Sequence, residues 1–143
     1  MIIKVMTRDT VEEEVAASSK KIAVISITDK GEGDVPFSSN ENLLGVHRMK
    51  FNDEYESKND GPQQSDFNEL RKFIDDISAD AEEIIVHCGA GMSRSPAVAE
   101  AVFKYLEYKG DVTYKKPDHS CEPNELVLMF ACSELGIEDP SQE

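Results

Sequence analysis

Blocks of apolar and polar residues alternate along this chain and predict strands and helices in turn. Short β-branched apolar runs at residues 2–6, 21–27 and 84–86 are typical of strands buried in a parallel sheet. Residues 43–51 alternate more loosely and predict a fourth strand. Apolar residues spaced three and four apart predict helices over residues 10–17, 66–77, about 96–110 and 124–135. This alternation favours an α/β fold with a central, mainly parallel sheet of about four strands flanked by helices.

Two polar stretches separate these elements and predict loops. Residues 29–41 and 52–65 are rich in Gly, Asp, Asn, Ser and Pro. A loop as long as the second is uncommon unless it has a function of its own. The chain has no internal repeat and no break in composition. We therefore expect residues 1–143 to form a single domain.

The charge balance narrows the choice of partners. The chain has 29 acidic and 15 basic residues and a formal charge of −14, which opposes attraction to nucleic acid or anionic lipid. It contains no run of eighteen apolar residues, so no membrane span is expected. It shows no secretory leader, so we expect a cytoplasmic location. The three cysteines should then be reduced, and their spacing does not favour a metal site. The sequence leaves the oligomeric state open.

The candidate chemistry lies where the strand at residues 84–86 ends. The chain continues as His-Cys-Gly-Ala-Gly-Met-Ser-Arg-Ser-Pro over residues 87–96 and then enters a predicted helix. Backbone N–H groups at the start of a helix converge on an anion, and glycines let the backbone approach it closely. A guanidinium at the start of that helix can bind two phosphate oxygens at once. The predicted phosphate-binding residues are Gly89, Ala90, Gly91, Met92, Ser93 and Arg94.

Three more residues of this segment have predicted roles. Cys88 lies at the bottom of the loop, where the helix dipole and Arg94 favour a thiolate and hence a nucleophile. Ser95 is placed to hydrogen-bond the Cys88 sulfur, which would help that sulfur to leave as a thiolate when its bond to phosphorus breaks. His87 is expected to support the loop from behind. A match of His, Cys, Gly, Ser, Arg and Ser at these positions has a chance of roughly 10⁻⁸ per start point at ordinary amino-acid usage.

At these residues the chain resembles the cysteine-based protein tyrosine phosphatases, and in its short length their small dual-specificity branch with bacterial and phage relatives. The resembling signature is His87-Cys88, five residues, then Arg94-Ser95. The resemblance implies a phosphatase domain that acts on phosphorylated protein or peptide. It implies a two-step reaction in which Cys88 takes the phosphoryl group and water removes it. It implies no metal and no organic cofactor.

The resemblance also implies an aspartate that protonates the leaving group, on a loop upstream of the signature. Asp53 directly follows the strand predicted at residues 43–51 and is the first candidate, and Asp60 on the same loop is the alternative. Low-molecular-weight phosphatases instead use an acid far downstream, which would favour Asp139. In that class the loop lies near the N-terminus, whereas here it is central and follows a histidine. Asp118 is a weaker candidate of the same type.

Two other functions stay open at this point. The loop could serve a phosphate-recognising module with little turnover, because the acid is assigned from its position alone. The enzyme could also act on a phosphoinositide, a nucleotide or an RNA 5′-phosphate. The strong negative charge argues against such polyanions. Cys121 or Cys132 could form a protective disulfide with Cys88 under oxidation.

Overall fold

The computed structural model describes residues 1–117 and 121–140. Within these residues five strands form one sheet and pair in parallel, in the order β3-β2-β4-β1-β5. The elements in chain order are β1 (Ile2–Thr7), α1 (Arg8–Ala17), β2 (Ile22–Thr28), β3 (Leu43–Lys50), the 3₁₀ helix η1 (Gln64–Phe67), α2 (Leu70–Ile77), β4 (Glu83–Cys88), α3 (Arg94–Glu107), β5 (Thr113–Lys115) and α4 (Glu125–Leu135).

The central strands are buried along their whole length. Every residue of β2 and β4 is buried, which explains why both strands are runs of apolar residues rather than alternating patterns. β4 lies between β2 and β1 in the middle of the sheet. Its register places Cys88 opposite Thr7 of β1, and His87 opposite Ser26 of β2. Cys88 therefore lies at the carboxyl end of the central strand, the edge where α/β proteins place their ligands.

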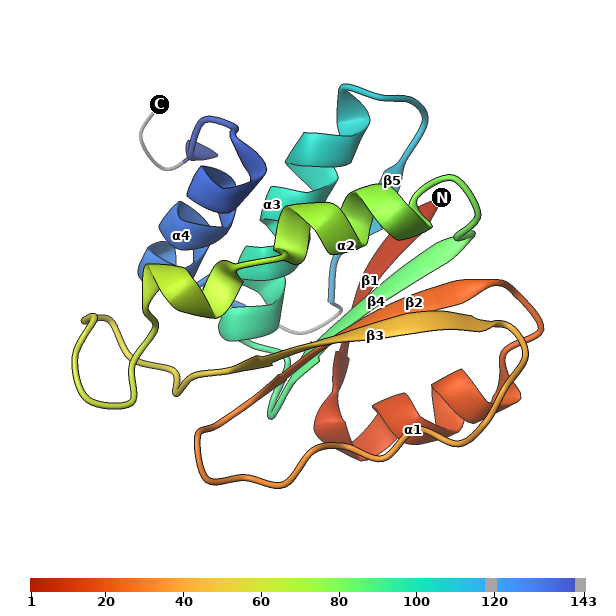
Figure 1. The fold of residues 1–143 in the computed structure, drawn as a ribbon, viewed down its shortest axis with the longest axis horizontal. Coiled ribbons are helices and arrows are strands. Elements are labelled where there is room, and N and C mark those ends of the chain that lie inside the picture. The colour runs from red at the N-terminus through yellow and green to blue at the C-terminus, as the bar shows by residue number, and fades with distance from the viewer. Residues whose placement is uncertain (118–120, 141–143) are drawn as a thin grey trace.

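Helices cover both faces of the sheet (Figure 1). α1 covers one face, and α2, α3 and α4 cover the other. Side chains along β4 alternate between two apolar clusters: Ile85 packs with Val11 and Val15 of α1, whereas Ile84 and Val86 belong to the larger cluster under the other three helices. None of the helices within residues 1–117 and 121–140 is long and apolar enough to cross a membrane.

The predicted fold class is confirmed, and three local predictions need correction. The sheet has a fifth strand, β5, whose three residues are too few for the apolar pattern to indicate a strand. The helix predicted over residues 66–77 is interrupted, because Glu69 has a positive φ of 69° between η1 and α2. α3 ends at Glu107, three residues before the predicted stop at Gly110.

Candidate active site

The loop of residues 89–93 joins the end of β4 to the start of α3 and rests on β1. The Arg8 N–H at the start of α1 donates to the Gly89 carbonyl over 3.1 Å. Gly91 has a positive φ of 68°, and a Cβ added there would lie 3.3 Å from the Met6 carbonyl oxygen. Both its φ and this close approach therefore favour glycine at residue 91. Ala90 and Met92 are exposed, so the loop presents its outer surface to solvent.

Cys88 lies beneath this loop with almost no exposed surface. Its side chain is 3% exposed, and its Sγ lies 3.1 Å from the hydroxyl oxygen of the fully buried Ser95. α3 begins at Arg94, so the sulfur faces a helix N-terminus, whose partial positive charge stabilises a negative charge. The structure thus brings together the predicted nucleophile and the residue predicted to support it.

Arg94 is held by two groups at the carboxyl ends of β2 and β3. Its Nη1 donates to Asp29 Oδ1 over 2.6 Å and to the Phe51 carbonyl oxygen over 2.8 Å. Both hydrogens of Nη1 are thereby used. Nε and Nη2 make no hydrogen bond to a described residue, and Nη2 lies 3.7 Å from the position of a Cβ added at Gly89. The guanidinium therefore extends over the loop with its remaining donors available to an anion.

Asp29 directly follows β2, and no local sequence pattern pairs it with Arg94. The side chains are 65 residues apart in sequence and meet because β2 lies next to β4 in the sheet. The Asp29 carboxylate is 44% exposed while the Arg94 side chain is 9% exposed, so the ion pair lies at the mouth of the site.

The two candidate acids of the loop after β3 lie in different surroundings. Asp53 Oδ1 accepts hydrogen bonds from the Ser93 hydroxyl and from Asn124 Nδ2, each over 2.9 Å. Asp53 is therefore next to the Cys88 loop. Asp60 contributes its backbone carbonyl to the Asn52 N–H over 2.7 Å, and its side chain is exposed. The contacts of the described residues connect only the first of these two carboxylates to the Cys88 loop.

Asn124 connects three parts of the site, and sequence reasoning identified it only as the start of the last helix. It is fully buried, and its Oδ1 accepts from Leu126 and Val127 N–H as the N-cap of α4. Its Nδ2 donates to Asp53 and to the Glu54 carbonyl. Its backbone N–H donates to the Ser93 carbonyl over 3.1 Å. Both the oxygen and the nitrogen of its side-chain amide have hydrogen-bond partners. The partners on the loop after β3 are distant in the sequence, so only the fold reveals the role of Asn124 in the site.

His87 lies behind the loop and is fully buried. Its Nε2 is 2.6 Å from the Ser26 hydroxyl on β2, and its Nδ1 is 3.4 Å from the Cys88 carbonyl oxygen. Burial lowers the pKa of His87 to about 4, and the positive charges of Arg8, Arg48 and Arg94 act in the same direction. The ring is therefore neutral at physiological pH and links β4 to β2 by a hydrogen bond.

The other residues considered from sequence lie elsewhere. Cys132 is buried in α4, where burial raises the pKa of its thiol to about 12, so it stays protonated. Asp139 follows the opposite end of α4 from Asn124. Asp118 lies outside the described residues. Cys121 is half-buried and, like Cys88 and Cys132, is not part of a disulfide.

Comparison with known protein families identifies the class of this protein. Residues 9–115 match the family model of the dual specificity phosphatase catalytic domain. Because that match spans about three-quarters of the chain, the chain belongs to this family and is a cysteine-based phosphatase. The matched span includes Asp29, Asp53, Cys88 and Arg94, and ends before Asn124. Searches of curated proteins and of solved structures gave no match.

Proposed function

We propose that this chain is a protein phosphatase that hydrolyses phosphotyrosine, phosphoserine and phosphothreonine through a phosphocysteine on Cys88. One observation carries the proposal. Cys88 Sγ lies 3.1 Å from Ser95 Oγ, beneath a loop whose Arg94 is already oriented by Asp29 and the Phe51 carbonyl. Such preorganisation suits charge stabilisation in a transition state, because the donors need not move during the reaction.

Binding of the phosphate uses donors of the Cys88 loop and of Arg94. Backbone N–H groups of the loop point toward the anion, as at other helix N-termini. Arg94 contributes Nε and Nη2 to two phosphate oxygens, because Nη1 is occupied by Asp29 and Phe51. The phosphorus is then held above the Cys88 sulfur.

In the first step the Cys88 thiolate attacks the phosphorus, an S–P bond forms and the ester P–O bond breaks. The leaving oxygen takes a proton from the carboxylic acid of Asp53. Oδ1 of Asp53 is held by Ser93 and Asn124, which leaves Oδ2 to carry that proton. Asn124 acts as a positioning residue, because it fixes the acid without reaching the reacting atoms.

In the second step water attacks the phosphorus of the phosphocysteine and the S–P bond breaks. Asp53, now a carboxylate, takes a proton from the water. The Ser95 hydroxyl donates a hydrogen bond to the departing sulfur, which leaves as a thiolate. The products are inorganic phosphate and the original enzyme, with Asp53 protonated again.

Protein is favoured over polyanionic substrates by the surroundings of the loop. Asp29, Asp53 and Glu54 border the site, and the whole chain has a charge of −14. Both oppose a substrate with many phosphates. Met92 on the loop is 49% exposed and Tyr55, two residues after Asp53, is 66% exposed. These apolar groups suit contacts with the side chains of a peptide.

Hydrolysis of a small aryl phosphate by wild type, Cys88→Ser and Cys121→Ser protein tests the proposal. Loss of the nucleophile should reduce kcat by on the order of 10³-fold or more, while Cys121→Ser should behave as wild type. Wild-type samples quenched in acid should contain protein that carries one phosphoryl group. Equal rates for wild type and Cys88→Ser would contradict the proposed mechanism.

A substrate panel tests the substrate class. We expect kcat/KM to be highest for phosphopeptides among phosphopeptides, a phosphoinositide, a nucleotide and an RNA 5′-phosphate. A higher kcat/KM for one of the last three would replace protein as the substrate. Tight binding of a phosphopeptide without any phosphoenzyme would instead indicate a recognition module.

A further inference from the structure

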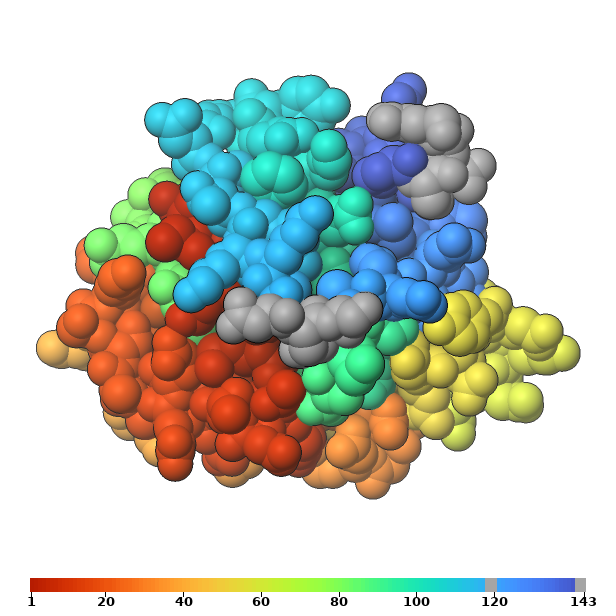
Figure 2. All heavy atoms as spheres, turned by 180° about the vertical axis from the view of Figure 1, so that it is seen from behind, coloured from red at the N-terminus to blue at the C-terminus, as the bar shows by residue number. Residues whose placement is uncertain are grey.

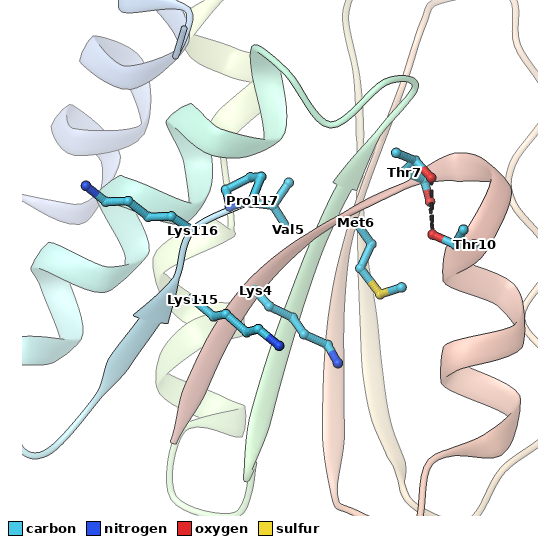
Figure 3. Close-up of a pocket in the computed structure, with 8 residues that line it drawn as sticks. All are labelled: Lys4, Val5, Met6, Thr7, Thr10, Lys115, Lys116 and Pro117. Carbon is cyan, nitrogen blue, oxygen red and sulfur yellow. Dashed lines mark hydrogen bonds between the residues drawn. The ribbon is translucent and has the colours of Figure 1, made fainter. Parts of the chain in front are cut away.

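A hollow of about 370 Å³ lies between β1, β5 and the start of α1, and we call it the β1–β5 hollow. Figure 3 shows side chains from the two strands and from α1 around it. Three of these residues are lysines, and none is acidic. Its lining residues are Lys4, Val5, Met6, Thr7, Thr10, Lys115, Lys116 and Pro117.

The hollow adjoins the Cys88 loop. Thr7, at its upper rim, is paired with Cys88 across the sheet. A Cβ added at Gly91 would lie 3.3 Å from the Met6 carbonyl oxygen, and Arg8, the residue after Thr7, donates its N–H to the Gly89 carbonyl. Lys4 lies three residues before Thr7 on the same strand, which corresponds to about 10 Å at roughly 3.3 Å per residue. The space-filling view in Figure 2 shows the N-terminal segment in red beside the residues near 90 in green.

The charge of the hollow comes mainly from Lys115. Lys4 is directly opposite Lys115 in the β1–β5 register, but its ammonium is paired with Glu14 at 2.5 Å and Glu83 at 2.8 Å. Lys115 is exposed and has no hydrogen bond or ion pair with a described residue. In Figure 3 Lys115 points toward Lys4, whereas Lys116 points to the opposite side of the strand. The Lys115 ammonium is thus a positive charge without a described counter-ion in a chain with 29 acidic residues.

We propose that the β1–β5 hollow binds an anionic group of the substrate polypeptide, two to four residues from the phosphorylated residue. The Lys115 ammonium supplies the charge, and the hydroxyls of Thr7 and Thr10, which are hydrogen-bonded to each other over 3.1 Å, add polar groups to the lining. An extended peptide covers the distance from the Cys88 loop to Lys115 in about three residues. The proposal rests on the proposed function, since it assumes a protein substrate. A carboxylate and a second phosphate share the required chemistry.

Binding of phosphotyrosine peptides to Cys88→Ser protein, followed by fluorescence anisotropy, tests the proposal without requiring turnover. The peptides carry Glu, phosphoserine or Ala at the third residue from the phosphotyrosine. This residue is placed before the phosphotyrosine in one set of three peptides and after it in another. Lys115→Gln should weaken binding of the Glu peptide about three- to fivefold, the range of a partly exposed charge pair, and leave the Ala peptide unchanged. Lys116→Gln should have a smaller effect, because its ammonium points away.

Lys20→Gln is the matched control. It removes the same charge from an exposed lysine just before β2, at the opposite end of the sheet from Cys88. Equal affinity of the Glu and Ala peptides, or equal losses in Lys115→Gln and Lys20→Gln, would overturn the proposal. The proposal would also be overturned if Lys115→Gln lowered the affinity for RNA or for anionic vesicles but not for the peptides. A larger loss for the phosphoserine peptide than for the Glu peptide would support the hollow and identify a second phosphate as its ligand.

The outcome stays separate from that of the proposed function. Wild-type turnover of a small aryl phosphate, which does not reach the hollow, is measured in parallel. Absence of that turnover would contradict the proposed function, while the anisotropy series would still decide whether the hollow binds an anion. Unchanged aryl phosphate turnover in Lys115→Gln is expected in either case.

Discussion

The Cys88 loop meets the rest of the molecule in different ways on its two sides. Toward β2, β3 and α4 side chains of the site make hydrogen bonds, in addition to the backbone bond from the Asn124 N–H to the Ser93 carbonyl. These are His87 with Ser26, Ser93 with Asp53, and Arg94 with Asp29 and the Phe51 carbonyl. Toward β1 the loop makes a hydrogen bond between backbone groups, from the Arg8 N–H to the Gly89 carbonyl, and its Gly91 lies close to the Met6 carbonyl. The first side fixes chemical groups, whereas the second fixes the path of the chain.

This difference separates chemistry from recognition within one short loop. The side-chain contacts orient an acid, a guanidinium and a histidine, so few rearrangements are needed once a phosphate is bound. Side chains of β1 and β5 line a hollow beside the loop, and Lys115 in this lining has no ion pair with a described residue. Substitutions on the first side should therefore alter rate or stability, while substitutions on the second should alter the choice of substrate.

The largest effect is expected from removal of the acid on the first side. Asp53→Asn should lower kcat for an alkyl phosphate by about 10²–10⁴-fold, the usual contribution of general acid catalysis. Asp60→Asn should change kcat less than about twofold, since only its backbone joins the described network. The measurement is kcat across pH 4 to 8 for both variants and wild type.

The shape of the pH profile adds a second criterion. The basic limb of the kcat profile reports titration of the general acid. This limb should be lost in Asp53→Asn alone. The same loss in Asp60→Asn alone would transfer the role to Asp60 and show that the loop adopts another conformation when substrate is bound.

The residues of the loop could be predicted from sequence because they are local. The strand at residues 84–86, the glycines and the Arg94–Ser95 pair are neighbours in the chain, and one strand–loop–helix unit places them together. In the sequence only its shorter distance to the strand favours Asp53 over Asp60. The structure adds that Asp53 accepts hydrogen bonds from Ser93 and Asn124 beside the loop.

The remaining parts of the site depend on pairings that no local pattern contains. Asp29 reaches Arg94 across 65 residues because β2 neighbours β4, and Asn124 reaches Asp53 across 71 residues because α4 begins beside the loop. β5 has three residues, of which only Tyr114 is apolar, and its pairing with β1 is set by tertiary contacts. Without β5 in the prediction, the β1–β5 hollow could not be predicted either.

A second prediction concerns His87, which links the loop to β2. Its pKa of about 4 in the folded chain lies below the value of 6.5 expected when unfolded. As pH falls below 6.5 the unfolded chain gains a proton that the folded chain does not, so stability falls until about pH 4 and this contribution then levels off. The loss is roughly 3 kcal/mol, from about 1.4 kcal/mol per pH unit.

Urea denaturation at pH 7 and pH 4 checks this prediction by comparing wild type with His87→Gln. Glutamine does not titrate, so the free energy of unfolding should fall by roughly 3 kcal/mol less in the variant than in wild type. Carboxylates titrate in both proteins and cancel in the comparison. Equal losses would show that the ring is protonated in the folded state, and the contact with Ser26 would then need another explanation.

The smallest effect is expected at Asp29, which orients Arg94 without reaching the phosphate. Asp29→Ala removes one of the two groups that accept hydrogen bonds from Arg94 Nη1. We expect kcat/KM for a small aryl phosphate to fall about tenfold, mainly through a higher KM, because small displacements of a binding group are costly. Asp29→Asn retains an acceptor oxygen and should recover most of that loss. Asp80→Ala, at an exposed aspartate in the turn after α2, controls for the change in net charge. If Asp29→Ala instead binds aryl phosphate more tightly, Asp29 competes with the phosphate for Arg94. The first side of the loop would then restrain the guanidinium rather than prepare it.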